Sequence, residues 1–237
     1  MFSPFQPVIA QEIFDLRKDY CALSVMAVNV RNNGEAGINS DLKGRLLASP
    51  PAWADAHLEA WREAYRQFGA KPQRTPPSAD ALIQRVRKDG QLPTINPVVD
   101  LYNTISVAFA IPIGGEDVAA YASSPTLMQA TGGEHFDTVK DGAPFLEPVP
   151  AGEVVWMDTQ GVTCRRWNLR QGIRTRIDGA TTEMWFVLER LEPMPISALL
   201  DAGRTLNDGL LALSPGAQSR CFLSDHTGTH TVSLRTE

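Results

Sequence analysis

Residues 96–117 read NPVVDLYNTISVAFAIPIGGED, and they predict a helix with a sharp beginning and a sharp end. Asn96 suits the N-cap because its side chain can accept a hydrogen bond from an unpaired helical amide. Pro97 follows at the first helical position, where its missing N–H is no loss. The apolar run continues to about residue 110, and IPIGG at residues 111–115 then breaks the helix.

Three short polar side chains share one face of this predicted helix. Asn96, Asp100 and Asn103 stand at positions i, i+4 and i+7, which a helix brings to the same side. Buried polar groups need partners, so this row has two interpretations. In one, it borders a pocket together with Gly114 and Gly115. In the other, Asn96 only caps the helix and Asp100 only fixes a neighbouring loop.

A second informative stretch, residues 162–171, reads VTCRRWNLRQ and is followed by Arg174 and Arg176. Five arginines and no acid lie between residues 165 and 176, in a chain whose net charge is −5. Arginine forks bind phosphates and carboxylates in two-point contacts and stack on bases, and a tryptophan beside them would suit the end of a nucleic-acid strand. The alternative is an ordinary strand whose arginines pair with acidic side chains. The candidate binding residues of this stretch are Arg165, Arg166, Trp167, Asn168 and Arg170.

The remaining elements follow one another in an irregular order. The pattern predicts a strand over 22–30, helices over about 52–69 and 79–88, short strands between 115 and 190, a helix over about 196–213, and a strand or ordered arm after residue 220. The helix over 52–69 carries an apolar stripe that should pack on the core: Leu58, Trp61, Tyr65 and Phe68. Ser78 is a candidate N-cap for the next helix. This order is typical of an α+β fold and not of a doubly wound sheet.

Composition narrows the class of protein. The chain has 237 residues, of which 43% are hydrophobic and 21% charged, as in ordinary globular domains. We predict a single domain over 1–237, with a core at about 10–213 and a C-terminal tail or extra strand at 214–237. The pI of about 5.4 argues against a protein that coats DNA or RNA through a basic surface.

Cysteines and apolar runs indicate the cellular setting. The three cysteines are widely spaced and form no C-x-x-C motif, so we expect no disulfide framework, no metal site and no cofactor. His226 and His230 stand four residues apart in a Thr/Gly-rich stretch, where a surface pair is the better interpretation. No signal peptide and no apolar run of about 20 residues is visible, so we expect a cytoplasmic protein that does not enter a membrane.

The stretch from Asn96 to Asp117 resembles, without a gap, a segment of the phenylalanyl-tRNA synthetase β subunit. Together with GGE at 132–134, PAGEVV at 150–155 and the arginine-rich stretch, it makes the chain similar to free-standing members of the B3/B4-type domain family over roughly residues 10–210. The resemblance implies an α+β fold of three layers that contains a β-sandwich of unusual topology, with helices packed on the sheets.

The resemblance also implies a function. In the synthetase, this domain hydrolyses tyrosine wrongly attached to the phenylalanine tRNA, so the chain would be a trans-acting editing hydrolase that binds the aminoacylated 3′ end of a tRNA. Three positions depart from the synthetase: Gly114 replaces a His, Tyr102 replaces a Thr, and an ungapped count puts the later acidic residue near Gly172. These departures favour the alternative, a non-catalytic module that binds an RNA end or a small amino acid-like ligand. No catalytic residue is assigned.

Overall fold

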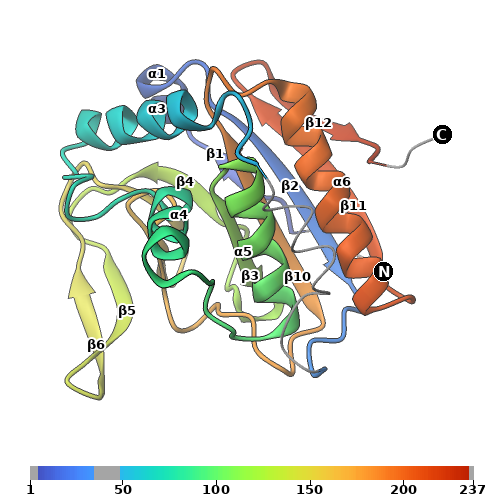
Figure 1. Ribbon diagram of the computed structural model, residues 1–237. Helices are drawn as coiled ribbons and strands as arrows, with labels where there is room; N and C mark the ends of the chain where they lie inside the picture. The colour runs from blue at the N-terminus through green and yellow to red at the C-terminus, as the bar shows by residue number, and fades with distance from the viewer. Residues whose placement is uncertain (1–4, 35–48, 235–237) are drawn as a thin grey trace.

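The computed structural model describes residues 5–34 and 49–234, and within them it contains two β-sheets and five α-helices (Figure 1). The helices are α1 (Gln11–Leu16), α3 (Ala54–Gln67), α4 (Ser78–Asp89), α5 (Pro97–Phe109) and α6 (Ile196–Leu213), with a short 3₁₀ helix η1 (Val118–Ala120). Residues 1–4, 35–48 and 235–237, which the predicted single domain includes, lie outside the described residues. None of the helices in the described ranges has the length and apolarity that crossing a bilayer requires.

The strands form one five-stranded and one seven-stranded sheet. The five-stranded sheet has the order β12 (Gly228–Val232), β11 (Gln218–Asp225), β2 (Cys21–Val28), β10 (Glu183–Arg190) and β3 (Ile113–Asp117), with every neighbouring pair antiparallel. The seven-stranded sheet has the order β1 (Val8–Ile9), β4 (Thr126–Gln129), β7 (Val154–Asp158), β8 (Gly161–Arg165), β5 (His135–Lys140) and β6 (Ala143–Pro148), with β9 (Arg170–Gln171) also paired to β8. The stretch after residue 213 thus contributes two strands: β11, which pairs with β2, and β12, which pairs with β11 at the edge of the sheet.

The five-stranded sheet is covered on both faces, which makes the fold three layers deep. All eight residues of β2 are buried. Leu23 and Val25 belong to the core shared with α5 and α6, which lie side by side over one face (Figure 1). Ala22 and Met26 belong to the core shared with the seven-stranded sheet and α3. Burial of a side chain the size of Leu23, Val25 or Met26 stabilises the fold by roughly 1.5–3 kcal/mol. The predicted α+β fold of three layers is confirmed.

Local signals account for both ends of α5. The Asn96 side chain accepts a hydrogen bond from the Val99 amide at 2.9 Å, and Pro97 occupies the first turn. The helix ends at Ala110, which has a φ of 49° in the left-handed region. The prediction for Ser78 is wrong, because α4 already begins at this residue and its hydroxyl makes no hydrogen bond within the described chain.

A buried histidine connects the helix layers at the end of α5. The Nδ1 atom of His57 lies 2.8 Å from the Ala110 carbonyl oxygen, and its Nε2 accepts hydrogen bonds from the Trp61 indole and the Leu191 amide. Burial lowers the pKa of His57 to about 4, so the ring is neutral and can accept at Nε2. Trp61 and Tyr65 of the predicted apolar stripe are fully buried, which confirms that this face of α3 packs on the core.

Candidate functional site

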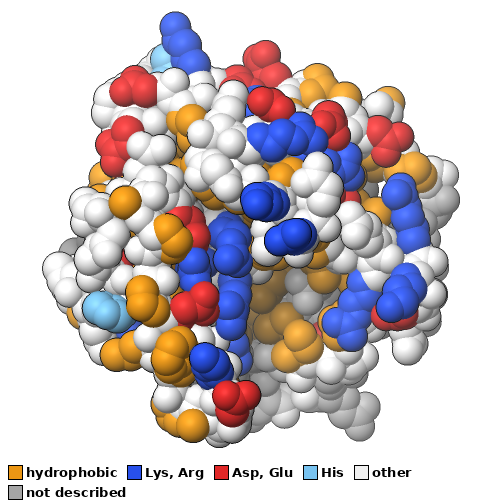
Figure 2. Space-filling model, turned by 90° about the vertical axis from the view of Figure 1, so that its left-hand side faces the viewer, with side chains coloured by type: hydrophobic (Ala, Val, Ile, Leu, Met, Phe, Trp, Pro, Cys, Tyr) orange, Lys and Arg blue, Asp and Glu red, His pale blue; other side chains and the backbone are white. Residues whose placement is uncertain are grey.

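Two hollows adjoin the arginine-rich segment at residues 164–171. The smaller, about 230 Å³, lies between α5, β3, the start of α4 and this segment, and we call it the candidate cavity. The larger, about 450 Å³, is bordered by residues 68–75, the turn at 150–151 and the arginine pair at 165–166, and we call it the basic hollow. Figure 2 shows the face that carries α4 and the β5–β6 hairpin, where Lys and Arg side chains gather around a depression.

The candidate cavity brings together four of the predicted residues: Asn103, Gly114, Gly115 and Asn168. It therefore lies where α5 meets the arginine-rich stretch. Gly115 permits this approach, because a Cβ atom there would lie 2.8 Å from Cε1 of Tyr102 and 3.1 Å from Cδ1 of Phe186. The Gly115 carbonyl oxygen accepts a hydrogen bond from the side-chain amide of Gln171 at 2.7 Å. This bond joins β3 to the arginine-rich segment.

Two asparagines line this cavity in different states. Asn103 is 8% exposed, and its side chain makes no hydrogen bond among residues 5–34 and 49–234. The Asn168 side-chain oxygen accepts from the Tyr65 hydroxyl at 2.8 Å and from the Ser78 amide at 3.3 Å. Asn168 is thus held in place by α3 and α4, whereas the Asn103 amide is available to a ligand.

Glu116 is the acidic group of the cavity, and the sequence analysis missed it. Its side chain is 4% exposed, and its Oε2 atom has no hydrogen-bond partner in the described part of the chain. Burial raises the pKa of Glu116 to about 8, against the opposing effect of the Thr175 hydroxyl and the Gln171 amide. Such a carboxyl group can exchange a proton near neutral pH. The only signal in the sequence is a pair of acids, Glu116 and Asp117, directly after two glycines.

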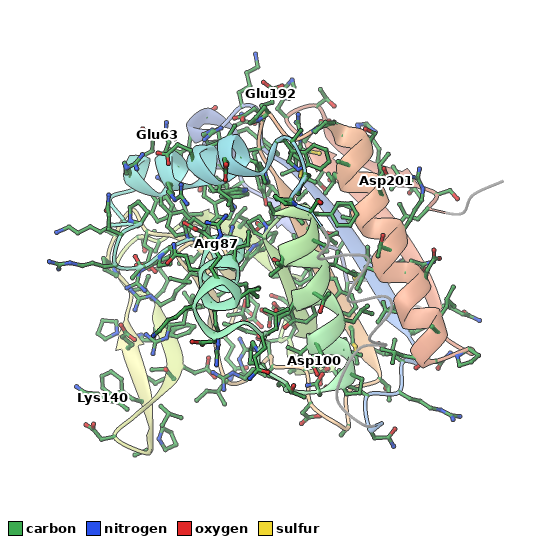
Figure 3. The ribbon with its side chains drawn as sticks, viewed as in Figure 1. Glu63, Arg87, Asp100, Lys140, Glu192 and Asp201 are labelled. Carbon is green, nitrogen blue, oxygen red and sulfur yellow. The ribbon has the colours of Figure 1, made fainter. Side chains whose placement is uncertain are left out.

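The other two members of the predicted polar row belong to the helix start. Asp100 accepts a hydrogen bond from the Ile95 amide at 2.8 Å through Oδ1, and Asn96 caps the first turn. Figure 3 shows Asp100 at the end of α5 where the helix begins. Seven residues of helix span about 10 Å, so Asn103 reaches the cavity while Asn96 stays at the opposite end. Neither Asn96 nor Asp100 lines the cavity.

Three arginines of the stretch pair with carboxylates. Arg165 is 2% exposed and donates two hydrogen bonds to Glu153 and one to Glu147. Arg170 is half-exposed and donates to the other oxygen of Glu147 at 3.1 Å. These contacts favour the alternative interpretation, in which arginines of the stretch pair with acidic side chains.

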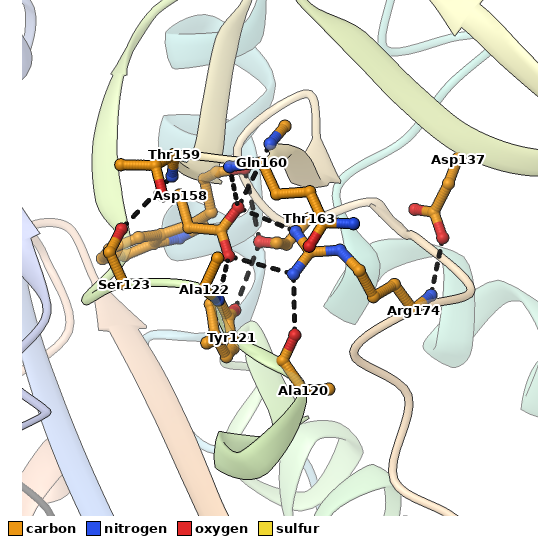
Figure 4. Close-up of polar contacts among 12 residues, drawn as sticks. Ala120, Tyr121, Ala122, Ser123, Asp137, Asp158, Thr159, Gln160, Thr163 and Arg174 are labelled. Carbon is orange, nitrogen blue, oxygen red and sulfur yellow. Dashed lines mark hydrogen bonds and ion pairs between the residues drawn. The ribbon is translucent and has the colours of Figure 1, made fainter.

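Arg174 provides the third of these pairs (Figure 4). It makes a two-point contact with Asp158 at 2.8 and 2.9 Å and also donates to the Ala120 carbonyl. Burial acts to raise the pKa of Asp158, but the hydrogen bonds from Arg174 and from the Ala122 amide outweigh it and hold the pKa below its ordinary value. This arginine connects β7 to the loop before β4 and stabilises the fold.

Trp167 has no face left for a base. It is fully buried, and its ring centroid lies 5.1 Å from that of Tyr20 and 5.3 Å from that of Trp61. The stacking interpretation of Trp167 is therefore corrected to a core role. Arg165 and Arg166 both line the basic hollow, but the Arg166 side chain, unlike that of Arg165, has no ion pair in the described ranges.

The remaining candidates for chemistry among the described residues are the thiol of Cys164 and the histidine pair at 226 and 230. Cys164 lines the candidate cavity, but burial raises the pKa of its thiol well above the ordinary value, so the thiol stays protonated. His226 lies in the β11–β12 turn and His230 in β12, not on a helix. Across the ranges that the structure describes, no three His, Cys, Asp or Glu side chains are grouped to hold a metal ion.

Glu116 should make folding depend on pH. Its pKa is about 8 in the folded chain and near its ordinary value of 4.5 when unfolded. Between these pH values the unfolded chain has lost a proton that the folded chain keeps. The contribution of Glu116 to the free energy of unfolding is therefore greatest below pH 4.5 and falls as the pH rises to 8. Glu189, whose pKa burial raises to about 7, acts in the same direction.

We expect Glu116→Gln to remove its share of this dependence. When the pH rises from about 5 to about 9, ionisation of Glu116 lowers the free energy of unfolding of the wild type. The variant escapes this loss, so the difference in stability between variant and wild type should shift in favour of the variant by on the order of a few kcal/mol. Urea unfolding at the two pH values measures this difference. Glu183→Gln, at the half-buried start of β10, is the control and should follow the wild type. If the free energies of unfolding of the wild type and Glu116→Gln changed equally between the two pH values, this carboxyl group would already be ionised in the folded protein at the lower pH.

Two comparisons with known proteins gave a match. The family model for the B3/4 domain matches residues 60–201. A solved N-terminal fragment of the phenylalanyl-tRNA synthetase β-subunit from Pyrococcus horikoshii is similar with a TM-score of 0.45 and 10% identity, over 92% of this chain and 52% of that one. The chain thus spans about half the length of that fragment. No curated protein matches the chain. Because the matched residues are more than half of the sequence, the chain belongs to the B3/4 domain family.

Proposed function

We propose that this protein hydrolyses the ester between a wrongly attached amino acid and the 3′ end of a tRNA, as a trans-acting editing enzyme of the cytoplasm. The observation that carries the proposal is one small cavity lined by a carboxyl group that titrates near neutral pH, Glu116, and by the unengaged amide of Asn103. Its volume of about 230 Å³ is below the ~300–1,000 Å³ of pockets for drug-sized ligands, and it suits a group the size of one amino acid.

The chemistry requires a base, an oxyanion donor and a proton for the leaving group. A water molecule beside ionised Glu116 gives its proton to the carboxylate and attacks the ester carbonyl carbon. The Asn103 amide donates a hydrogen bond to the oxygen that becomes negative. When the C–O bond to the ribose breaks, Glu116 returns the proton to the ribose oxygen, and the products are the free amino acid and the tRNA.

The test is deacylation of a panel of correctly and wrongly charged tRNAs. We expect at least one mischarged tRNA to be cleared, with a rate that rises with pH up to about 8 as Glu116 ionises. Glu116→Gln should lose about 10²-fold or more in rate and also lose the inflection, and Asn103→Ala should lose about 10²-fold. Asn207→Ala is the matched control, because Asn207 is as buried as Asn103 but lies on α6, away from the cavity.

A second candidate function is binding without chemistry. It is favoured by Gly114, which stands where the synthetase segment has a His and leaves one wall of the cavity without a side chain. In that case every charged tRNA would survive at high protein concentration, while an RNA end or an amino acid-like ligand would still bind. Survival of all esters together with Asn103-dependent binding would replace the first proposal with the second.

A further inference from the structure

We propose that the basic hollow binds a backbone phosphate of the RNA whose aminoacyl end enters the candidate cavity; this rests on the function proposed above. The hollow is lined by four cationic side chains and by one acid, Glu153. Arg165 occupies both oxygens of that acid. The three cations left over are Lys71, Arg74 and Arg166.

These three cations lack partners within the described residues. Lys71 and Arg74 are exposed on the loop after α3, and Arg166 is half-buried across the hollow from them. No ion pair or side-chain hydrogen bond is formed by any of the three in residues 5–34 and 49–234. A concave site with several uncompensated positive charges attracts an anion, in a protein whose net charge is −5. Arginine forks match phosphate oxygens in two-point contacts.

The backbone at Arg166 is held in an unfavourable conformation. Arg166 and Trp167 have φ values of 49° and 66°, in the left-handed region that residues with side chains rarely adopt, at about 1–3 kcal/mol each. The buried Trp167 ring and a 2.6 Å hydrogen bond from its amide to the Val154 carbonyl oxygen hold this turn. Both arginines line the hollow, but Arg165 is paired with Glu153, whereas the Arg166 side chain has no ion pair in the described residues. Strain of this kind is typical of functional sites.

The basic hollow and the candidate cavity are lined by residues of the same two segments, 164–171 and 71–78. Residues 165–166 line the hollow, whereas 164, 168, 169 and 171 line the cavity. The loop after α3 contributes residues 71, 74 and 75 to the hollow, and the first residue of α4, Ser78, lines the cavity. The Ser78 amide donates to Asn168, which joins the two segments. A ligand with a small acyl group and a phosphate close to it can therefore occupy both, and a free amino acid cannot.

The ligand chemistry is tested with two esters of one amino acid, on adenosine and on a trinucleotide that ends in adenosine. We expect the Arg74→Ala/Arg166→Ala double variant to lose about 10–100-fold in kcat/KM for the trinucleotide ester, mostly through KM, and to hydrolyse the adenosine ester like the wild type. Arg85→Ala is the control, because Arg85 is an exposed arginine of α4 paired with Asp89 and lies outside the hollow. An equal loss for both esters would overturn the proposal.

Binding of the uncharged trinucleotide tests the site even if no ester is hydrolysed. The dependence of log K on log salt should become shallower by about 0.7 for each phosphate contact that a variant removes. Equal affinity and slope for wild type and double variant would overturn the proposal. Inorganic phosphate is the competitor that separates the two sources of phosphate, and we expect only weak displacement. Full displacement by low concentrations of inorganic phosphate would assign the hollow to the free anion and not to RNA.

Discussion

Arg165→Ala is expected to lower the free energy of unfolding by about 3–5 kcal/mol. Arg165 donates to both oxygens of Glu153, at 2.7 and 2.8 Å, and also to Glu147. Glu153 is only 8% exposed, so removal of the guanidinium leaves a buried carboxylate without its counter-charge. Breaking one partner of a buried ion pair is costly for this reason, even where the intact pair contributes little net stability.

Urea denaturation of Arg165→Ala beside Arg170→Ala measures this effect. Arg170 contacts the same Glu147, but its side chain is 42% exposed, so its removal should change stability by about 1 kcal/mol or less. Adding Glu153→Gln to Arg165→Ala should restore part of the loss, because it removes the uncompensated charge. If the two arginine variants were equally stable, the interpretation of Arg165 as a buried structural cation would fail.

Trp167→Ala should be similarly destabilising, by about 3–5 kcal/mol, through loss of a fully buried aromatic side chain. Trp167 packs against Tyr20, Trp61 and Phe68, with ring centroids 5.1, 5.3 and 6.2 Å away. The packing of this ring also offsets the strain of the left-handed turn at 166–167. Its removal should therefore loosen both the candidate cavity and the basic hollow.

Thermal and urea unfolding, together with trinucleotide binding, test this prediction. Trp167→Phe should lose less stability than Trp167→Ala, because a smaller ring still fills part of the space. Trp53→Ala is the control, since Trp53 is half-buried at the edge of the core and away from both hollows. A Trp167→Ala protein as stable as Trp53→Ala would contradict the view that this ring anchors the turn.

Helices were the most predictable part of this fold. The predicted bounds of the helix over 196–213 coincide with α6, and the Asn96–Pro97 signal marks the start of α5, because both depend on local periodicity and capping. Ser78 is not the cap because α4 already begins there, and its amide donates to the side chain of Asn168, ninety residues away, a partner that no local pattern records. The pairing of strands into two sheets also depends on distant partners and was not predicted from the pattern.

The candidate site was predictable only where a helix face or a glycine pair marks it. Asn103 and Gly115 were identified in this way, and both line the cavity. Glu116 was missed because its burial comes from packing beside β10 and α5, which no local pattern records. The arginines were ambiguous for the same reason, since the carboxylates that engage Arg165 come from other strands and loops.

The position of β2 in the five-stranded sheet has a consequence for how the protein forms during synthesis. This strand is translated before α3, α4 and α5, but its two neighbours, β10 and β11, are translated only after these helices. Until they emerge, the unpaired edges of an apolar strand are open to other chains, and such distant pairings form slowly. Nascent chains that stall before β11 is made, even those that have completed α6, should therefore be retained by chaperones. In these chains at least one edge of β2 still has no partner.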